Sequence, residues 1–166
     1  MESTINHFKN IIPKRDSSSH KGTFGHCLNI SGCEKYTGAA FLSSISALKV
    51  GCGLCTLAGI KQVCSASAAK KPDIIFLPLE STKENTISPN NIKKIKAELN
   101  KFSSIAVGCG LSTNKETQFF VKDLIKVLIS EDIPLIIDAD GINAISELKI
   151  TKLPEKTILT PHPKEM

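Results

Sequence analysis

Short apolar runs alternate with helix-forming segments along most of this 166-residue chain, and this alternation is the feature that most constrains its fold. Strands that are apolar throughout are typical of a parallel sheet whose two faces are both covered. Right-handed crossovers then bring the carboxyl ends of all strands to one edge of the sheet. We expect strands at residues 26–31, 54–60, 73–77, 104–107, 134–137 and 157–160.

Helical spacing of apolar residues fills the gaps between these runs. Residues 38–50 form a helix in this interpretation, with Thr37 as its N-cap and Gly51 ending it. Further helices are expected at 62–69, from Ser88-Pro89 onward, and behind a segment with capping-box spacing at 113–116. The pattern predicts one α/β domain over 1–166, a mostly parallel sheet with helices on both faces, and an irregular segment at 1–25.

The composition excludes several classes of function. The net charge of +5 is spread over scattered lysines, Trp is absent and aromatics make up 5%, so a nucleic-acid surface is not expected. No apolar stretch is long enough to span a bilayer, and residues 1–8 lack a basic segment followed by an apolar core. We therefore expect a cytoplasmic protein whose six cysteines are reduced thiols. The Cys52–Cys55 spacing has no second ligand pair, so no metal site is predicted.

Small and polar residues follow the predicted strands, where a parallel sheet places its ligands. Small residues let backbone N–H groups approach a ligand, and a free helix N-terminus suits phosphate. The pattern predicts a phosphorylated or nucleotide-like ligand. The residues are Gly38, Ala39 and Ala40 after the first strand, Gly108 and Gly110 after the fourth, Asp138, Asp140 and Asn143 after the fifth, and His162 after the sixth.

Each of these signals also has an ordinary structural interpretation. The glycines Gly108 and Gly110 are compatible with a tight turn, and Asp138 and Asp140 with helix caps. The nucleotide fingerprint GxGxxG and the Walker A motif are both absent. This absence argues against a typical NAD-binding Rossmann domain and against a P-loop enzyme.

The ordered set of motifs resembles the ADP-dependent NAD(P)H-hydrate dehydratases of the ribokinase-like superfamily. The matching segments are HKGTFGH at 20–26, YTGAA at 36–40, GCGL at 51–54, GCGL at 108–111, DADGIN at 138–143 and TPHPKE at 160–165. The resemblance implies a three-layer αβα fold and the repair of hydrated NADH and NADPH. It implies ADP (or ATP) as phosphoryl donor, Mg²⁺, and release of AMP and phosphate in the ADP reaction.

The resemblance also implies a set of site residues. Ala40, Gly110 and His162 would line the pocket for the hydrate, with Lys21, Gly38, Gly108, Asp138, Asp140 and Asn143 near the site. No catalytic residue is assigned in this chain, because the family's Gly-Thr-Gly-Asp base and nucleotide site belong to roughly a hundred further residues. Cys109 stands where the family usually has Pro, and Ser112 and Lys164 where it usually has Gly.

The chain is therefore expected to be incomplete at its carboxyl end, with a homo-oligomer or a missing carboxyl-terminal half as its partner. An uncovered sheet face would leave it marginally stable alone. Two alternatives stay open. One is another ribokinase-like small-molecule kinase, and the other is a non-catalytic nucleotide-binding fragment that assembles with an intact homologue.

Overall fold

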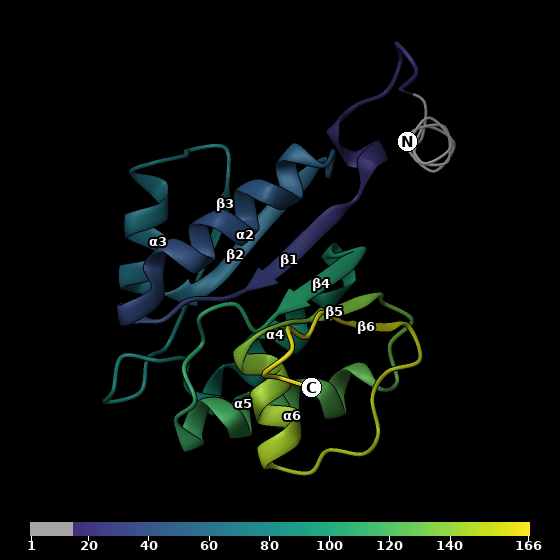
Figure 1. Cartoon of the computed structure of the whole chain (residues 1–166). Helices are drawn as coiled ribbons and strands as arrows, with labels where there is room; N and C mark the ends of the chain where they lie inside the picture. The colour runs from purple at the N-terminus through teal and green to yellow at the C-terminus, as the bar shows by residue number, and fades with distance from the viewer. Residues whose placement is uncertain (1–14) are drawn as a thin grey trace.

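The computed structural model describes residues 15–166, which form one sheet of six parallel strands in the order β3-β2-β1-β4-β5-β6 (Figure 1). This confirms the predicted α/β class. The strands are β1 (His26–Ile30), β2 (Leu54–Ile60), β3 (Ile75–Leu79), β4 (Ser104–Val107), β5 (Leu135–Ile137) and β6 (Thr157–Leu159).

Five strands lie within a residue of their predicted bounds, and the exception is β3. It begins at Ile75 rather than Asp73 and continues through Pro78 to Leu79. Asp73 instead pairs with Lys71 in the preceding turn. Pro78 is tolerated because β3 is an edge strand. No strand pairs with its outer side, so the N–H that proline lacks is not needed for a hydrogen bond there.

Helices connect the strands. They are α2 (Thr37–Lys49), α3 (Lys61–Ala68), α4 (Ile92–Glu98), α5 (Lys115–Leu128) and α6 (Asp140–Glu147), with short 3-10 turns η1 (Lys21–Phe24), η2 (Glu34–Tyr36), η3 (Pro89–Asn91) and η4 (Leu99–Lys101). Two predicted caps are wrong. The N-cap of α2 is Tyr36, without a side-chain bond, and the N-cap of α5 is Asn114, whose side chain accepts from the N–H of Thr117.

The predicted irregular segment is only partly described. Residues 1–14 lie outside the described residues, and 15–25 contain a turn followed by η1. Among residues 15–166, none of the helices combines the length and the apolar character needed to cross a bilayer.

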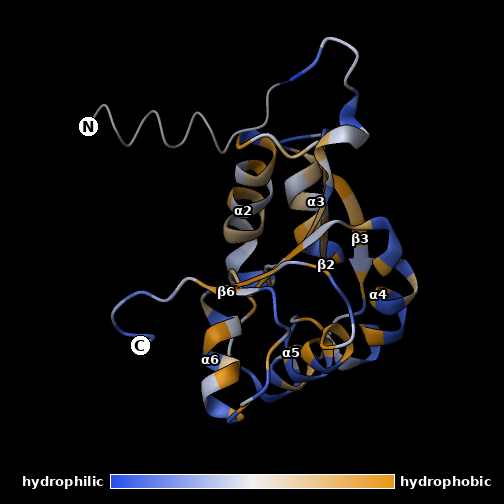
Figure 2. Cartoon of the chain, turned by 90° about the vertical axis from the view of Figure 1, so that its right-hand side faces the viewer, coloured by the Kyte–Doolittle hydropathy of each residue, from blue (hydrophilic) through white to orange (hydrophobic). Residues whose placement is uncertain are grey.

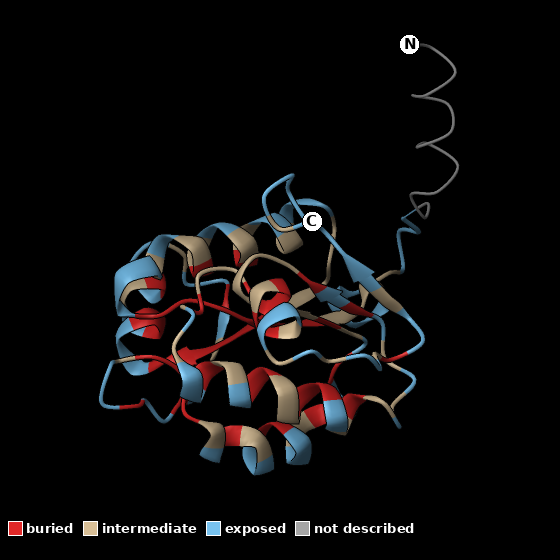
Figure 3. Ribbon diagram, turned by 60° about the horizontal axis from the view of Figure 1, so that its bottom comes forward, coloured by how far each residue is buried: buried red, intermediate tan, exposed pale blue. Residues whose placement is uncertain are grey.

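The helices form two layers, one on each side of the sheet (Figures 1 and 2). Helices α2 and α3 pack on β1, β2 and β3, whereas α4, α5 and α6 lie on the other side. The buried residues, red in Figure 3, lie between sheet and helices and include Leu28, Ile30, Ile105 and Phe120. The strand order reverses between β1 and β4, and in open α/β sheets this is where ligands bind.

Candidate functional site

The loop that follows β4 touches the start of α2 at the point where the strand order reverses. Gly110 has φ 67°, and a Cβ on it would lie 2.7 Å from Cβ of Tyr36 and 2.8 Å from Cβ of Ala39. The N–H of Gly32, after β1, donates to the carbonyl of Cys109 at 2.9 Å. Only glycine permits this contact, which explains why the sequence has glycine at position 110.

Gly108 brings the loop after β4 against the loop after β5. Its φ is 129°, and a Cβ would lie 1.8 Å from the carbonyl oxygen of Asp138. The first turn of α6 continues this close approach, since Gly141 packs against Gly108. Ala139, between β5 and α6, has φ 46°, a conformation that costs a non-glycine residue energy.

The carboxylates of Asp138 and Asp140 hold these loops together. Asp138 accepts from the thiol of Cys109 at 3.1 Å and from the hydroxyl of Thr160 at 2.8 Å. Asp140 accepts from the backbone N–H of Ser112 at 2.8 Å and from the amide of Asn143 at 3.2 Å. Neither side chain caps α6, whose N-cap is Ala139 without a side-chain bond. The helix-cap interpretation is therefore wrong.

The Cys109 thiol is neutral in this environment. Burial raises its pKa, and so do the hydrogen bond to Asp138 and the negative charge of that carboxylate, to about 12. A thiol is a nucleophile only as the thiolate. Cys109 therefore acts as a hydrogen-bond donor to Asp138.

The start of α2 offers backbone donors at the same edge. Gly38 is exposed and has open space where a Cβ would be. The N-terminus of α2 has no side-chain cap, and the turn η2 leads directly into it. Ala40 is fully buried, and its Cβ would lie 2.7 Å from a Cβ on Gly32. Its side chain therefore packs below the surface of the site, against Gly32.

His162 follows β6 in a short, exposed loop that is folded on itself. Its Nδ1 accepts from the N–H of Lys164 at 3.1 Å, and its Nε2 lies 3.1 Å from a Glu165 carboxylate oxygen. Both contacts are satisfied by the neutral tautomer with the proton on Nε2. Thr160, two residues earlier, ties this loop to Asp138.

Lys21 is not brought to this edge. It lies in η1 before β1, and its carbonyl packs against Gly53, just before β2. Residues that precede parallel strands lie at the amino edge, so Lys21 is apart from the other predicted residues within this chain.

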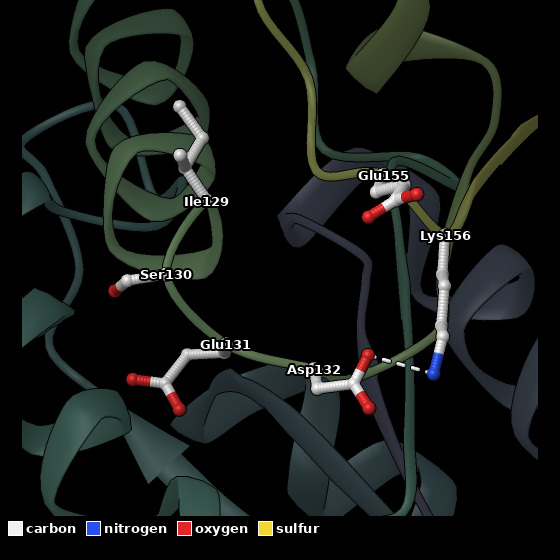
Figure 4. Close-up of a pocket in the computed structure, with 6 residues that line it drawn as sticks. All are labelled: Ile129, Ser130, Glu131, Asp132, Glu155 and Lys156. Carbon is white, nitrogen blue, oxygen red and sulfur yellow. Dashed lines mark ion pairs between the residues drawn. The ribbon is translucent and has the colours of Figure 1, made fainter.

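Two hollows differ in their relation to the site. A polar cleft of about 410 Å³ lies beside Asn143 and is lined by Thr113, Gln118, Asn143, Ser146 and Glu147. A smaller hollow of about 190 Å³ lies before β5 and β6, at the amino edge, and holds the Asp132–Lys156 ion pair (Figure 4). Asp132 is 85% exposed there, so this hollow has no desolvated group of the kind typical of an active site.

Asp138 and Asp140 are the carboxylates of the described residues at this edge that could meet a Mg²⁺ ion. Within 15–166 no three His, Cys, Asp or Glu side chains gather closely enough to hold a metal. The carboxylates of Asp138 and Asp140 are engaged by the donors described above.

Two polar contributors were not among the predicted site residues. Thr160 is the hydroxyl partner of Asp138. Asn29, buried in β1, donates to the hydroxyls of Ser43 and Ser44 at 2.8 Å and so fixes α2 on the sheet. A polar residue inside an apolar strand was the available signal for Asn29, and Thr160 belonged to the TPHPKE segment that the family resemblance matched.

Comparison with known sequences matches the chain to one protein family. The family model described as NAD(P)H-hydrate dehydratase matches residues 27–166. The Bifunctional NAD(P)H-hydrate repair enzyme Nnr of Thermofilum pendens is 38% identical over 158 residues, covering 93% of this chain and 29% of its own length. The human ATP-dependent (S)-NAD(P)H-hydrate dehydratase is 32% identical, over 98% of this chain and 45% of its own length.

Solved structures agree with this placement. The hypothetical protein SMU.573 from Streptococcus mutans superposes with a TM-score of 0.79 at 28% identity, over 95% of this chain and 53% of its own. The ADP/ATP-dependent NAD(P)H-hydrate dehydratase of Bacillus subtilis, co-crystallised with ATP/Mg²⁺, gives 0.70 at 25% identity, over 96% and 52%. The chain thus spans between 29% and 53% of the length of these four proteins. On its sequence and its fold, it belongs to the NAD(P)H-hydrate dehydratase family.

Proposed function

We propose that this chain supplies the hydrate-binding part of an enzyme that dehydrates (6S)-NAD(P)H hydrate back to NAD(P)H. The observation that carries the proposal is the packing of Gly110 against Tyr36 and Ala39, which joins a glycine loop to an uncapped helix start at the strand-order reversal. Backbone N–H groups there suit the phosphates of a nicotinamide nucleotide. His162 on the β6 loop and the backbone at Gly110 would face the hydrated ring, with the buried Ala40 packed behind them.

In the proposed reaction a nucleotide phosphorylates the hydroxyl group of the hydrate, which converts a poor leaving group into a good one. The hydrate's hydroxyl oxygen attacks the terminal phosphorus of ADP or ATP, and its proton passes to a base. The C–O bond then breaks with phosphate leaving, and loss of a ring proton restores the double bond. ADP yields AMP and phosphate, and the names of the relatives support either nucleotide as donor.

The base and the nucleotide site are proposed to come from a carboxyl-terminal half of the kind expected from the family resemblance. Asp138 and Asp140 have their carboxylates occupied by loop-holding bonds, so they position the site. The proposal places the chain in the cytoplasm, because its six free cysteines suit a reducing compartment.

Calorimetric titration of the full chain with NADPH tests the binding step. We expect binding that Gly110→Ala weakens at least tenfold, because the added methyl displaces the start of α2. Absence of binding would refute the hydrate-binding assignment. With a carboxyl-terminal half present, nucleotide-dependent recovery of NADH absorbance is expected, whereas a phosphorylated product without NADH would identify a small-molecule kinase instead.

A further inference from the structure

Tyr36 is an exposed aromatic residue at the most tightly packed point of the candidate site. Its Cβ would lie 2.7 Å from a Cβ on Gly110, yet the residue is 52% exposed. Within residues 15–166, its ring takes part in no ring–ring or cation–ring contact. A face of the ring is therefore open to solvent beside the loop that follows β4.

Two segments fix the backbone that carries this ring. The N–H of Tyr36 donates to the carbonyl of Cys33 at 3.0 Å and closes η2. Glu34, in the same turn, is bonded twice to Asn85 in the loop after β3. Its N–H donates to the Asn85 carbonyl at 3.2 Å, and its carboxylate accepts from the Asn85 amide at 2.8 Å. Asn85 has φ 56°, which asparagine adopts more readily than most residues. A ring on a fixed backbone loses less conformational freedom when a ligand binds.

A fixed, exposed aromatic ring in a ligand site is suited to stacking on a flat ligand ring. Aromatic side chains hold the bases of nucleotides in this way, because both partners have an apolar face. Exposure alone does not make such a platform. Phe119 is 48% exposed as well, but it belongs to α5, in the other helix layer. What distinguishes Tyr36 is its place against Gly110.

We propose that the nicotinamide-derived ring of the dinucleotide stacks on Tyr36, and that the Glu34–Asn85 pair positions Tyr36 for this contact. The inference rests on the proposed function, which brings that ring to Gly110, and it adds the side chain that holds the face of the ring. The hydrate has tetrahedral carbons where the product has a double bond. A flat platform contacts the product ring more fully than the hydrate ring, so the stacking strengthens as the ring flattens during the reaction.

Calorimetric titration of the full chain with NADH and with ADP-ribose tests the stacking. ADP-ribose carries the adenine and the pyrophosphate but lacks the nicotinamide ring. Tyr36→Leu should weaken NADH binding about tenfold and leave ADP-ribose binding unchanged. Tyr36→Phe keeps the ring and should restore the affinity for NADH to within about threefold of the parent. Phe119→Leu is the matched control, since it removes a similarly exposed ring from the other helix layer. Circular dichroism of each variant checks that it is folded.

The positioning role of Glu34 is tested by combining variants. Glu34→Ala removes the carboxylate that holds Asn85 and should weaken NADH binding about threefold in the parent background. It should have no further effect in the Tyr36→Leu background, because a positioning residue acts only through the ring that it positions. An equal loss in both backgrounds would show that Glu34 acts independently of Tyr36 and would overturn this role.

Fluorescence gives a second readout, because Tyr36 is the only tyrosine and the chain has no tryptophan. Saturation with NAD⁺ should quench the tyrosine emission, whereas saturation with ADP-ribose should not. Unchanged NADH affinity in Tyr36→Leu would overturn the inference, and so would an equal loss for ADP-ribose, which would place the adenine half on Tyr36. A parent chain that binds neither NADH nor ADP-ribose would overturn the proposed function, and this inference with it. None of these readouts requires dehydratase activity.

Discussion

At the scale of single residues, replacing Gly108 or Gly38 by alanine should change the free energy of unfolding in opposite directions, although both are glycines of the candidate site. Gly108→Ala places a methyl group 1.8 Å from the carbonyl oxygen of Asp138 at φ 129°, and we expect it to lower the free energy of unfolding by about 3 kcal/mol or more. Gly38 has open space in a helix, so Gly38→Ala should raise it by about 0.5–1 kcal/mol. Urea denaturation of both variants measures the difference. Equal effects would contradict the close approach of the two loops.

The Cys109 thiol gives a residue-scale prediction that depends on pH. With its pKa raised to about 12, the thiolate at pH 8 is on the order of one part in ten thousand. The labelling rate by iodoacetamide should therefore rise about tenfold per pH unit up to pH 10 without a plateau. Asp138→Asn removes the charge and should speed labelling, while Asp140→Asn, which bonds Ser112 instead, should not. A plateau near pH 9 would show an ordinary thiol.

At the scale of elements, mutations at the start of α5 can distinguish Thr113 from Asn114 as the N-cap of this helix. Asn114 accepts from the N–H of Thr117 and also bonds the hydroxyl of Thr86, whereas Thr113 is exposed outside the helix. Asn114→Ala should cost about 1–2 kcal/mol of unfolding free energy. Thr113→Ala should stay within about 0.5 kcal/mol of the parent. Thermal or urea unfolding of the pair decides between the capping box predicted from the sequence and the cap described in the structure.

Some helices and strands could be predicted from the sequence, and others could not. The six strands could be predicted because each is a short apolar run, including β6, which is largely exposed in this chain. Helix α6 was not predicted, because Asp138-Ala139-Asp140-Gly141 has turn-forming residues and the helix begins after a backbone conformation at Ala139 that no sequence pattern signals. The capping-box spacing at 113–116 also pointed to Thr113, whereas the side chain that caps α5 is that of Asn114.

The candidate site was only partly predictable for a related reason. Its residues were identified from their places at strand ends and from the family motifs, and most do lie at one edge. Their partners depend on contacts between distant segments, such as Thr160 with Asp138 and Ser112 with Asp140, which periodicity does not encode. The topology predicts that these residues lie at one edge of the sheet. Their hydrogen-bond partners can be identified only in the folded structure.

At the scale of the whole molecule, the half-covered sheet predicts concentration-dependent association of the isolated chain. Ile158 is 61% exposed on the edge strand β6, whose outer N–H and C=O groups are available for pairing. Ile158→Lys should raise the concentration at which light scattering begins, because a charged edge residue disfavours strand pairing, and should leave the melting temperature nearly unchanged. Phe119→Lys, an equally simple exchange on the opposite face, should have little effect. A parent chain that unfolds in one step with high stability and scatters at no concentration would contradict both the marginal stability and the role of the open face.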